Sequence, residues 1–257
     1  MPRHFGWGAA AIVAVSASTA AVQVEPPQEV RSQLGEYPFV GAWRGHHGHA
    51  IGLCTAELVA KEWVLTAGHC ATRMLRHEVD HVQVTFAHGG DVERGVTHCI
   101  HADQKGVDLA LCHLKLAVGA FPPVALNADL YRTHGLHGGP VMCVGTAHGL
   151  HTTGPKILEY EDNGAHLYVN NRGGNGMHAG DSGGAWVHKI ADPAKGPNAS
   201  MWVLSGVIHG GEGSPEHRRG VAVQPSFIRW WIDRIVTNAS GTGLSWVHAK
   251  NATPAQL

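Results

Sequence analysis

Glycine and proline divide most of this chain into short segments, and that division constrains its fold more than any other feature. The 257 residues include 34 glycines and 13 prolines. The runs between them are rich in β-branched and aromatic residues, a pattern typical of strands bounded by turns. The runs that we predict as strands are "YPFVGAW", "AIGLCTAELV", "EWVLTA", "VQVTFA", "DLALCHL", "PVMCVGTA", "KILEYED", "AHLYVNN", "GGAWVHKI", "MWVLSGVI" and "GVAVQ". The pattern predicts an antiparallel all-β fold in two halves of similar size.

One segment near the end of the sequence has a different periodicity. In "PSFIRWWIDRIV", Pro225 and Ser226 precede apolar residues at helical spacing, namely Phe227, Trp230, Trp231 and Ile235. Proline in the first turn followed by such spacing is typical of an amphipathic helix. We therefore predict a C-terminal α-helix whose apolar side packs on the strands, followed by a polar tail over residues 238–257.

The first 21 residues have the features of a secretory signal peptide. Arg3 precedes an apolar run over residues 5–17 that is too short to span a bilayer, and small residues follow around Ala20 and Ala21. A retained anchor is the alternative, but the run lacks a charged stop-transfer flank. We expect a secreted protein without membrane association after signal removal. Residues 22–36 would form an N-terminal arm or a short propeptide.

The charge balance and the histidine content limit the classes of ligand. Lys and Arg total 19 against 20 Asp and Glu, and nucleic-acid-binding proteins usually carry a basic excess, so no nucleic acid is expected. Several of the 21 histidines form local groups: His46, His47 and His49; His98 and His101; His134 and His137; His148 and His151. Zinc or copper could bind at such spacing, but most of these groups have no cysteine or acidic ligand close by. We expect solvated loop histidines and no metal.

Three short motifs hold side chains suited to nucleophilic catalysis. Ser182 lies in "GDSGG", His69 in "VLTAGHC" and Asp108 in "GVDLALCHL". A serine hydroxyl needs a base in contact with it and a third group that orients the base. Asp108 is the only acid beside an apolar strand, so its burial would require a hydrogen-bonded partner. For "GDSGG" alone, a glycine-rich surface turn is the alternative interpretation.

Taken together and in this order, the motifs resemble the catalytic segments of the trypsin- and chymotrypsin-like serine proteases. "TAGHC" is similar to the family's TAAHC, "DLAL" to its D-[IL]-A-L strand and "GDSGG" to its nucleophile loop. The resemblance implies two antiparallel six-stranded β-barrels with a C-terminal helix over residues 37–237. It also implies a monomeric serine endopeptidase that needs no cofactor, with protein or peptide substrates and proteinaceous protease inhibitors as partners.

Two other functions remain as alternatives. A catalytically inactive, protease-like binding protein could use the same fold, although such proteins usually carry a substituted triad residue and this chain does not. A secreted histidine-rich metal-binding protein would explain the histidine groups but would leave the three motifs as coincidence.

The resemblance also gives each motif residue a role. Ser182 would attack the scissile carbonyl, His69 would take and return its proton, and Asp108 would fix the histidine tautomer. Gly180 and Ser182 would direct backbone N–H groups at the developing oxyanion. Gly183 would leave room for close packing behind the nucleophile, as would its neighbour Gly184.

Asp181 resembles the aspartate that receives a new N-terminal amine when a zymogen of this family is cleaved. However, no Ile/Val-Val-Gly-Gly start precedes Tyr37. We therefore expect that the amine does not reach Asp181 in the usual way. Another group must then satisfy this acid, since an unpaired buried carboxylate is costly.

The cysteines predict one disulfide and leave another open. Cys54 and Cys70 resemble the family disulfide that ties the histidine loop to its neighbouring strand. Cys99 and Cys112 flank the segment with Asp108, and their pairing is left open. Cys143 is then the remaining thiol of an odd number.

The resemblance places a substrate pocket at Gly176, Met177, His209, Gly210 and Gly211. Gly176 stands where trypsins carry an aspartate, so cleavage after Lys or Arg is not predicted. His209 has two interpretations. It could line the pocket and favour an acidic substrate side chain through a charge-assisted hydrogen bond. Alternatively, it could hydrogen-bond Asp108 or water, as the family serine at this position does.

Overall fold

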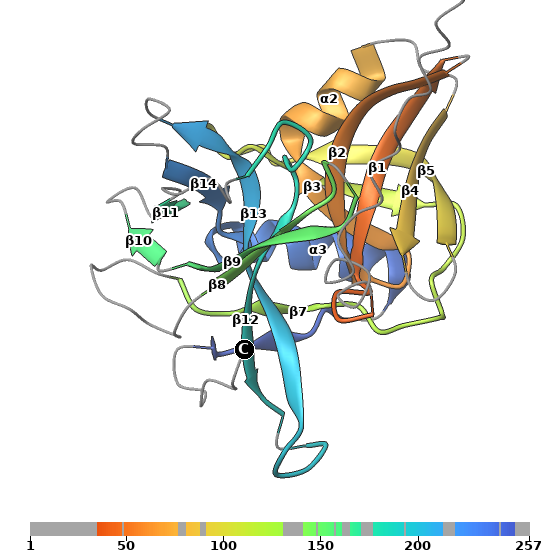
Figure 1. The fold of residues 1–257 in the computed structure, drawn as a ribbon. Coiled ribbons are helices and arrows are strands. Elements are labelled where there is room, and N and C mark those ends of the chain that lie inside the picture. Colours follow the sequence, from red (N-terminus) through yellow and green to blue (C-terminus); the bar gives the residue numbers. More distant parts are fainter. Residues whose placement is uncertain are drawn as a thin grey trace, which may run out of the picture.

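The computed structural model describes residues 35–47, 49–76, 81–87, 91–130, 141–147, 149–156, 158–160, 165–170, 177–192, 194–212, 219–241 and 243–249. The predicted signal peptide, residues 22–34 of the predicted arm and the pocket residue Gly176 lie outside these ranges. The described chain is mostly β, with a barrel and a second sheet side by side (Figure 1).

The first half forms a closed six-stranded antiparallel barrel. Its strands are β1 (Val40–His47), β2 (His49–Ala60), β3 (Trp63–Ala67), β4 (His81–Ala87), β5 (Asp91–His101) and β6 (Leu109–Leu114), in the order β1-β2-β3-β6-β5-β4. The barrel closes where β1 pairs with β4, with Trp43 opposite Val84. Trp43, Leu58, Leu65 and Phe86 are among its fully buried side chains. This barrel confirms the first of the two predicted ones.

Strand β5 is absent from the strands predicted by sequence. Its described side chains are all exposed or only partly buried, and Glu93, Arg94 and His98 interrupt its apolar residues. Backbone pairing with β4 and β6 holds this strand in the barrel, so it needs no continuous apolar run.

The second half forms a nine-stranded sheet. Seven strands follow the order β10-β11-β14-β13-β12-β8-β9. They are β8 (Val141–Gly145), β9 (His151–Lys156), β10 (Leu158–Tyr160), β11 (His166–Asn170), β12 (Ala185–Ala191), β13 (Ser200–Glu212) and β14 (Arg219–Val223), while β7 (Ala125–Asn127) pairs with β13 and with β15 (Trp246–Val247). Within the described residues this sheet is not closed, so a second six-stranded barrel is not confirmed.

The predicted C-terminal helix is present. A 3-10 turn, η1 (Pro225–Ile228), leads into α3 (Arg229–Ser240), which ends at Gly241 in the left-handed conformation. Trp231, Ile232 and Val236 are buried. Trp230 departs from the prediction, because 55% of it is exposed and the Arg234 guanidinium lies over its ring.

A further helix, α2 (Gly68–Arg76), is not predicted by the sequence pattern. It follows β3 directly and begins with the residues of "GHC". Cys70 and Ala71 are buried in its first turn, whereas Arg73 is exposed. This helix is short and has only one buried turn, so its apolar residues show no helical periodicity in the sequence.

Part of the predicted polar tail is packed against the body of the protein. The Trp246 indole N–H donates to Asp233 Oδ1 at 2.6 Å, and the Arg229 guanidinium lies over its ring. Ala249 is buried, and the carboxylate of Asp129 lies 2.8 Å from His248 Nδ1. These contacts attach residues 243–249 to α3 and β7.

Two disulfides join elements of the barrel. The predicted Cys54–Cys70 bond is confirmed and links β2 to α2. Cys99 and Cys112, whose pairing the sequence leaves open, form a second bond between the paired strands β5 and β6. Cys143 is buried in β8.

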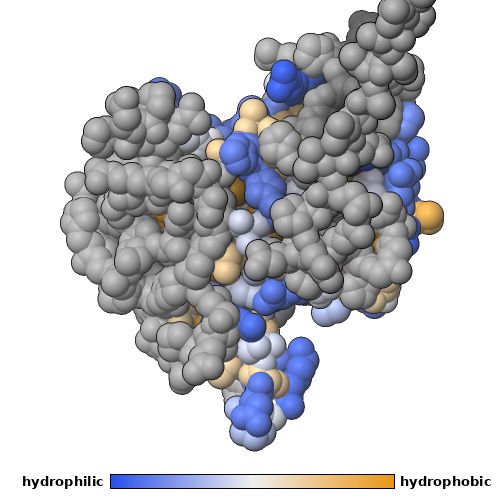
Figure 2. All heavy atoms as spheres, in the orientation of Figure 1, coloured by the Kyte–Doolittle hydropathy of each residue, from blue (hydrophilic) through white to orange (hydrophobic). Residues whose placement is uncertain are grey.

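A single large hydrophobic cluster extends from the barrel into the second sheet. It contains Leu58 and Leu65 from the barrel and Val187 and Leu204 from the second sheet. The described surface visible in Figure 2 is mainly hydrophilic, with small hydrophobic areas between. In the described part of the chain, no helix has both the length and the apolar character needed to cross a membrane.

One acid is buried without compensation. Glu57 in β2 is fully buried, and within the described chain neither of its carboxylate oxygens makes a hydrogen bond. Burial raises the pKa of Glu57 well above its usual value, because the charged form loses its hydration. A group whose pKa is raised on folding favours the folded state when protonated. Stability should therefore fall as the pH rises above the ordinary value of 4.5 toward the pKa in the folded protein.

Replacing Glu57 with a side chain that does not titrate should remove this loss of stability at higher pH. We expect Glu57→Gln to raise the free energy of unfolding at neutral pH by up to about 3 kcal/mol, because it removes the cost of keeping the acid protonated, about 1.4 kcal/mol for each pH unit above 4.5, and to flatten the decline above that pH. Urea unfolding at a series of pH values measures both effects. Glu93→Gln, at an exposed position of β5, is the control and should leave the profile unchanged. A steep decline that persists in Glu57→Gln would contradict this account.

Candidate active site

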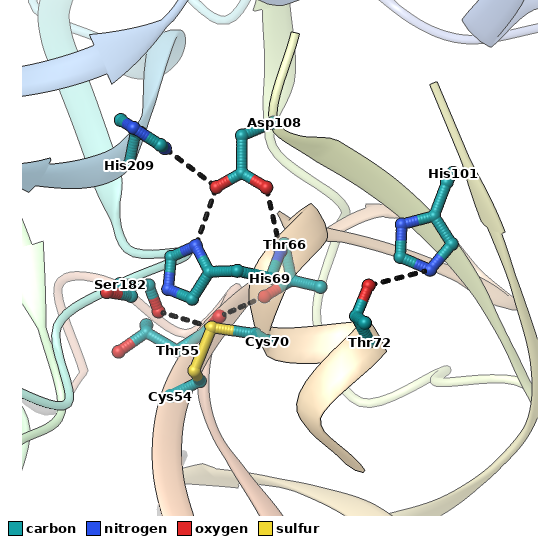
Figure 3. Close-up of polar contacts among 10 residues, drawn as sticks. All are labelled: Cys54, Thr55, Thr66, His69, Cys70, Thr72, His101, Asp108, Ser182 and His209. Atoms are coloured by element: carbon teal, nitrogen blue, oxygen red, sulfur yellow. Dashed lines mark hydrogen bonds and ion pairs between the residues drawn. A yellow bond between two sulfur atoms is a disulfide. The ribbon is translucent and has the colours of Figure 1, made fainter. Parts of the chain in front are cut away.

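Strand pairing in the barrel brings His69 and Asp108 together. In the antiparallel ladder of β3 and β6, Ala67 lies opposite Leu109. The residues that follow β3 therefore lie beside the residues that precede β6. His69 stands in the first turn of α2, and Asp108 directly precedes β6, so their side chains meet at this end of the barrel (Figure 3).

Two hydrogen bonds join these residues. Asp108 Oδ2 lies 2.6 Å from His69 Nδ1, and Asp108 Oδ1 accepts the backbone N–H of His69 at 2.7 Å. Because a carboxylate can only accept, Nδ1 carries the proton and Nε2 is left as the basic nitrogen of the neutral ring. A Cβ added at Gly68 would lie 2.7 Å from Asp108 Oδ1, so this approach requires glycine. The pair thus fixes both the orientation and the tautomer of the imidazole.

Ser182 comes from the second sheet, in the turn before β12. Its carbonyl oxygen accepts the N–H of Thr55 at 2.8 Å and lies 3.6 Å from Cys70 Sγ, next to His69 in the chain. Gly183 N–H donates to Ile208 O in β13. In the described residues the Ser182 hydroxyl makes no hydrogen bond to His69. Catalytic hydrogen bonds are often long without substrate and tighten when it binds.

The turn before Ser182 offers two backbone donors. Gly180 adopts φ of 110°, a conformation that favours glycine, and its carbonyl accepts the Thr55 hydroxyl at 3.2 Å. Among the described residues, the N–H groups of Gly180 and Ser182 donate to no protein acceptor. These are the two N–H groups predicted for an oxyanion site.

His209 in β13 also binds Asp108. Its Nδ1 lies 2.7 Å from Asp108 Oδ2, and its ring stands edge-on to the His69 ring, with centroids 6.0 Å apart. Burial by itself would raise the pKa of Asp108, but the hydrogen bonds from His209 and His69 outweigh it and hold that pKa well below its usual range. Asp108 is thus ionised at neutral pH. His209 had two interpretations, and the one that includes a hydrogen bond to Asp108 is the one seen in the structure.

A cavity of about 600 Å³ opens beside this cluster, and His166 and Tyr168 of β11 line it together with His69, Asp108 and His209. The predicted pocket residues Gly210 and Gly211 follow His209 in β13 and pair with Val221 and Gly220. A Cβ at Gly210 would meet no atom within 4 Å. Met177 is partly buried and packs on the hydrophobic cluster around Trp186.

His69, Asp108 and His209 are also the described residues that come closest to a metal site. One ligand atom from each lies within 4.8 Å of the others. Cys54, His69 and Cys70 meet the same criterion, but the two sulfurs are joined in a disulfide and cannot act as thiolate ligands. In the group of His69, Asp108 and His209, the Nδ1 atom of each imidazole is already used in a hydrogen bond to Asp108.

The expectation that the grouped histidines are solvated is wrong for His151. This side chain is only partly exposed, and its Nε2 lies 3.1 Å from Oδ2 of the buried Asp181. The spacing of histidines in the sequence gives no sign of this pair. The available signal was Asp181 itself, since a buried acid without an N-terminal amine requires another partner. Of the other grouped histidines, His98 stacks on His113, with ring centroids 5.4 Å apart.

No protein-family model matches the sequence, and a search of curated proteins finds no significantly similar chain. The resemblance to serine proteases therefore rests on the three motifs.

The turn that holds Ser182 depends on glycine at position 183. Its φ is 83°, and an added Cβ would overlap the Thr55 carbonyl oxygen and the Thr66 hydroxyl. Gly106 has a nearly identical φ of 84° but open space around the same position. Alanine substitutions at Gly183 and Gly106 therefore distinguish the cost of steric overlap from the cost of backbone strain.

We expect Gly183→Ala to destabilise the protein by about 3 kcal/mol or more, because strain and overlap add. Gly106→Ala should cost about 1 kcal/mol from strain alone. Urea unfolding followed by circular dichroism measures both. Equal destabilisation by the two substitutions would show that the close packing behind Ser182 is absent.

Proposed function

We propose that this protein is a secreted serine endopeptidase that hydrolyses protein or peptide substrates through His69, Asp108 and Ser182. The observation that carries the proposal is the pairing of His69 with Asp108 at 2.6 Å, beside the loop that presents Ser182. This arrangement leaves a basic nitrogen on an oriented imidazole, the requirement for activating a serine hydroxyl.

The residues would act in the following sequence. The Ser182 hydroxyl attacks the substrate carbonyl carbon while His69 Nε2 accepts its proton. The N–H groups of Gly180 and Ser182 stabilise the negative oxygen that forms. His69 then protonates the leaving amine, which leaves an acyl group on Ser182. A water molecule, deprotonated by His69, releases the acid and restores the serine.

The fold is consistent with this proposal, because each half supplies part of the site. His69 and Asp108 belong to the barrel, and Ser182 and His209 belong to the second sheet. We propose that the second sheet corresponds to the second barrel of trypsin-like proteases, which places the site where the two halves meet. The protein would act as a monomer, with proteinaceous protease inhibitors as further partners.

An inactive protease-like binding protein is the alternative. The observation in its favour is that the Ser182 hydroxyl makes no hydrogen bond to His69 among the described residues. The two functions differ in the reactivity of this hydroxyl, because only an activated serine reacts rapidly with a fluorophosphonate.

We expect Ser182→Ala to lower peptidase activity by several orders of magnitude and to abolish fluorophosphonate labelling, because the triad acts as a unit. Peptide-library cleavage and labelling of the secreted protein measure these effects. Ser200→Ala, at an exposed serine in β13, should retain full activity. Absence of both turnover and labelling in the unmodified protein would favour the inactive alternative.

A second prediction concerns the substrate side chain. Because the Nδ1 of His209 is engaged by Asp108 at 2.7 Å, its proton is not available to a substrate carboxylate. We expect peptides cleaved after Glu and after Gln to have similar kcat/KM values. A severalfold preference for Glu that His209→Ser removes would instead support a role of His209 in the pocket wall.

A further inference from the structure

The carboxylate of Asp181, next to the nucleophile, is buried and fully engaged. Asp181 is 1% exposed, and a Cβ at Gly145 in β8 would overlap its carboxylate, so it lies against the backbone of that strand. Oδ1 accepts the N–H of Ala147 at 3.0 Å, and Oδ2 accepts the N–H of His178 at 2.7 Å. The only side-chain partner within the described residues is His151, with Nε2 at 3.1 Å from Oδ2.

The surroundings of His151 specify its protonation state. Its Nε2 faces the Asp181 carboxylate, and its Nδ1 lies 3.0 Å from the carbonyl oxygen of Gly149. Both of these groups can only accept hydrogen bonds. A neutral imidazole has one N–H and would leave one ring nitrogen facing an acceptor without a proton between them. The imidazolium, with two N–H groups, satisfies both, so the geometry requires a cation here.

Asp181 is also coupled by its backbone to the turn that holds the nucleophile. Its N–H donates to His178 O at 3.0 Å, and its carbonyl accepts the N–H of Gly184 at 2.8 Å. Gly180 and Ser182 flank it directly. A displacement of Asp181 would therefore also move the backbone N–H groups of Gly180 and Ser182.

We propose that His151 is a positioning residue that, as an imidazolium, supplies the internal cation that holds Asp181 and thereby the Gly180–Ser182 turn in its active arrangement. This inference rests on the proposed peptidase function. It assigns to a side chain of β9 the task of keeping the oxyanion donors in place, so that the turn needs no cation from elsewhere in the chain.

The charges around His151 agree with this role. Burial lowers the pKa of His151, but the hydrogen bond and the charge of Asp181 outweigh it, so the pKa is raised above 6.5. The pKa of Asp181 is lowered by the same pair, against the effect of its burial. The His178 ring, 6.0 Å from that of His151, is the other titratable group facing it within the described residues. A raised histidine pKa means that the interaction is complete below 6.5 and is lost as the pH rises through the raised value.

The test uses the secreted full chain and compares His151→Gln and His151→Lys with the unmodified protein across pH. His151→Gln should lose on the order of 10²-fold in kcat with little change in KM, because the oxyanion donors are misplaced. His151→Lys should restore most of the activity and shift the alkaline decline of kcat upward, since lysine titrates near 10. His248→Gln is the matched control. It removes a histidine that also pairs with a buried acid, Asp129, in the C-terminal segment, and should leave the profile unchanged.

A second measurement uses the unmodified protein, so its result does not depend on whether the variants fold. Nitrogen-15 NMR of the unmodified protein at pH 7 should show both nitrogens of His151 protonated, and a neutral ring would overturn the inference. Unchanged kcat and an unchanged alkaline decline in folded His151→Gln would overturn it as well. By contrast, an unmodified protein that neither cleaves peptides nor reacts with a fluorophosphonate would overturn the peptidase function itself, whatever the NMR result.

Discussion

The Asp108 carboxylate is the contact on which the candidate site depends. It binds the backbone and the ring of His69 from the barrel and the ring of His209 from the second sheet. These bonds keep the acid ionised although it is largely removed from solvent. One ionised group therefore orients the imidazole and also joins the two halves of the fold at the position where the proposed chemistry occurs.

Three acids in this protein differ in how the cost of burying their carboxyl groups is offset. Asp108 and Asp181 each meet imidazoles and backbone N–H groups, and their pKa values are lowered as a result. Glu57 has no side-chain partner among the described residues, and burial raises its pKa. The two acids beside the proposed nucleophile are thus each satisfied by histidine side chains and backbone N–H groups.

Local patterns in the sequence predict much of the barrel, helix α3 and the pairing of His69 with Asp108. Those features depend on strand alternation, on helical spacing and on motifs that are short in sequence. Strand β5 and helix α2 were not predictable in the same way, because their stability comes from pairing and packing with distant elements. The partnership of His151 with Asp181 was also hidden, because no motif marks His151 and only the fold brings the two residues together. Whether the second half closes into a barrel is likewise decided by long-range pairing.

Thr55 of the barrel hydrogen-bonds several residues of the second half. Its N–H binds the Ser182 carbonyl, and its hydroxyl reaches both the Gly180 carbonyl and, at 2.8 Å, the Thr146 hydroxyl. A strand of the barrel thus forms part of the support for a turn that belongs to the other sheet. Neither half, made as a separate polypeptide, would contain a complete site. For a peptidase of the proposed kind, a nascent chain would therefore have no activity until both halves had docked.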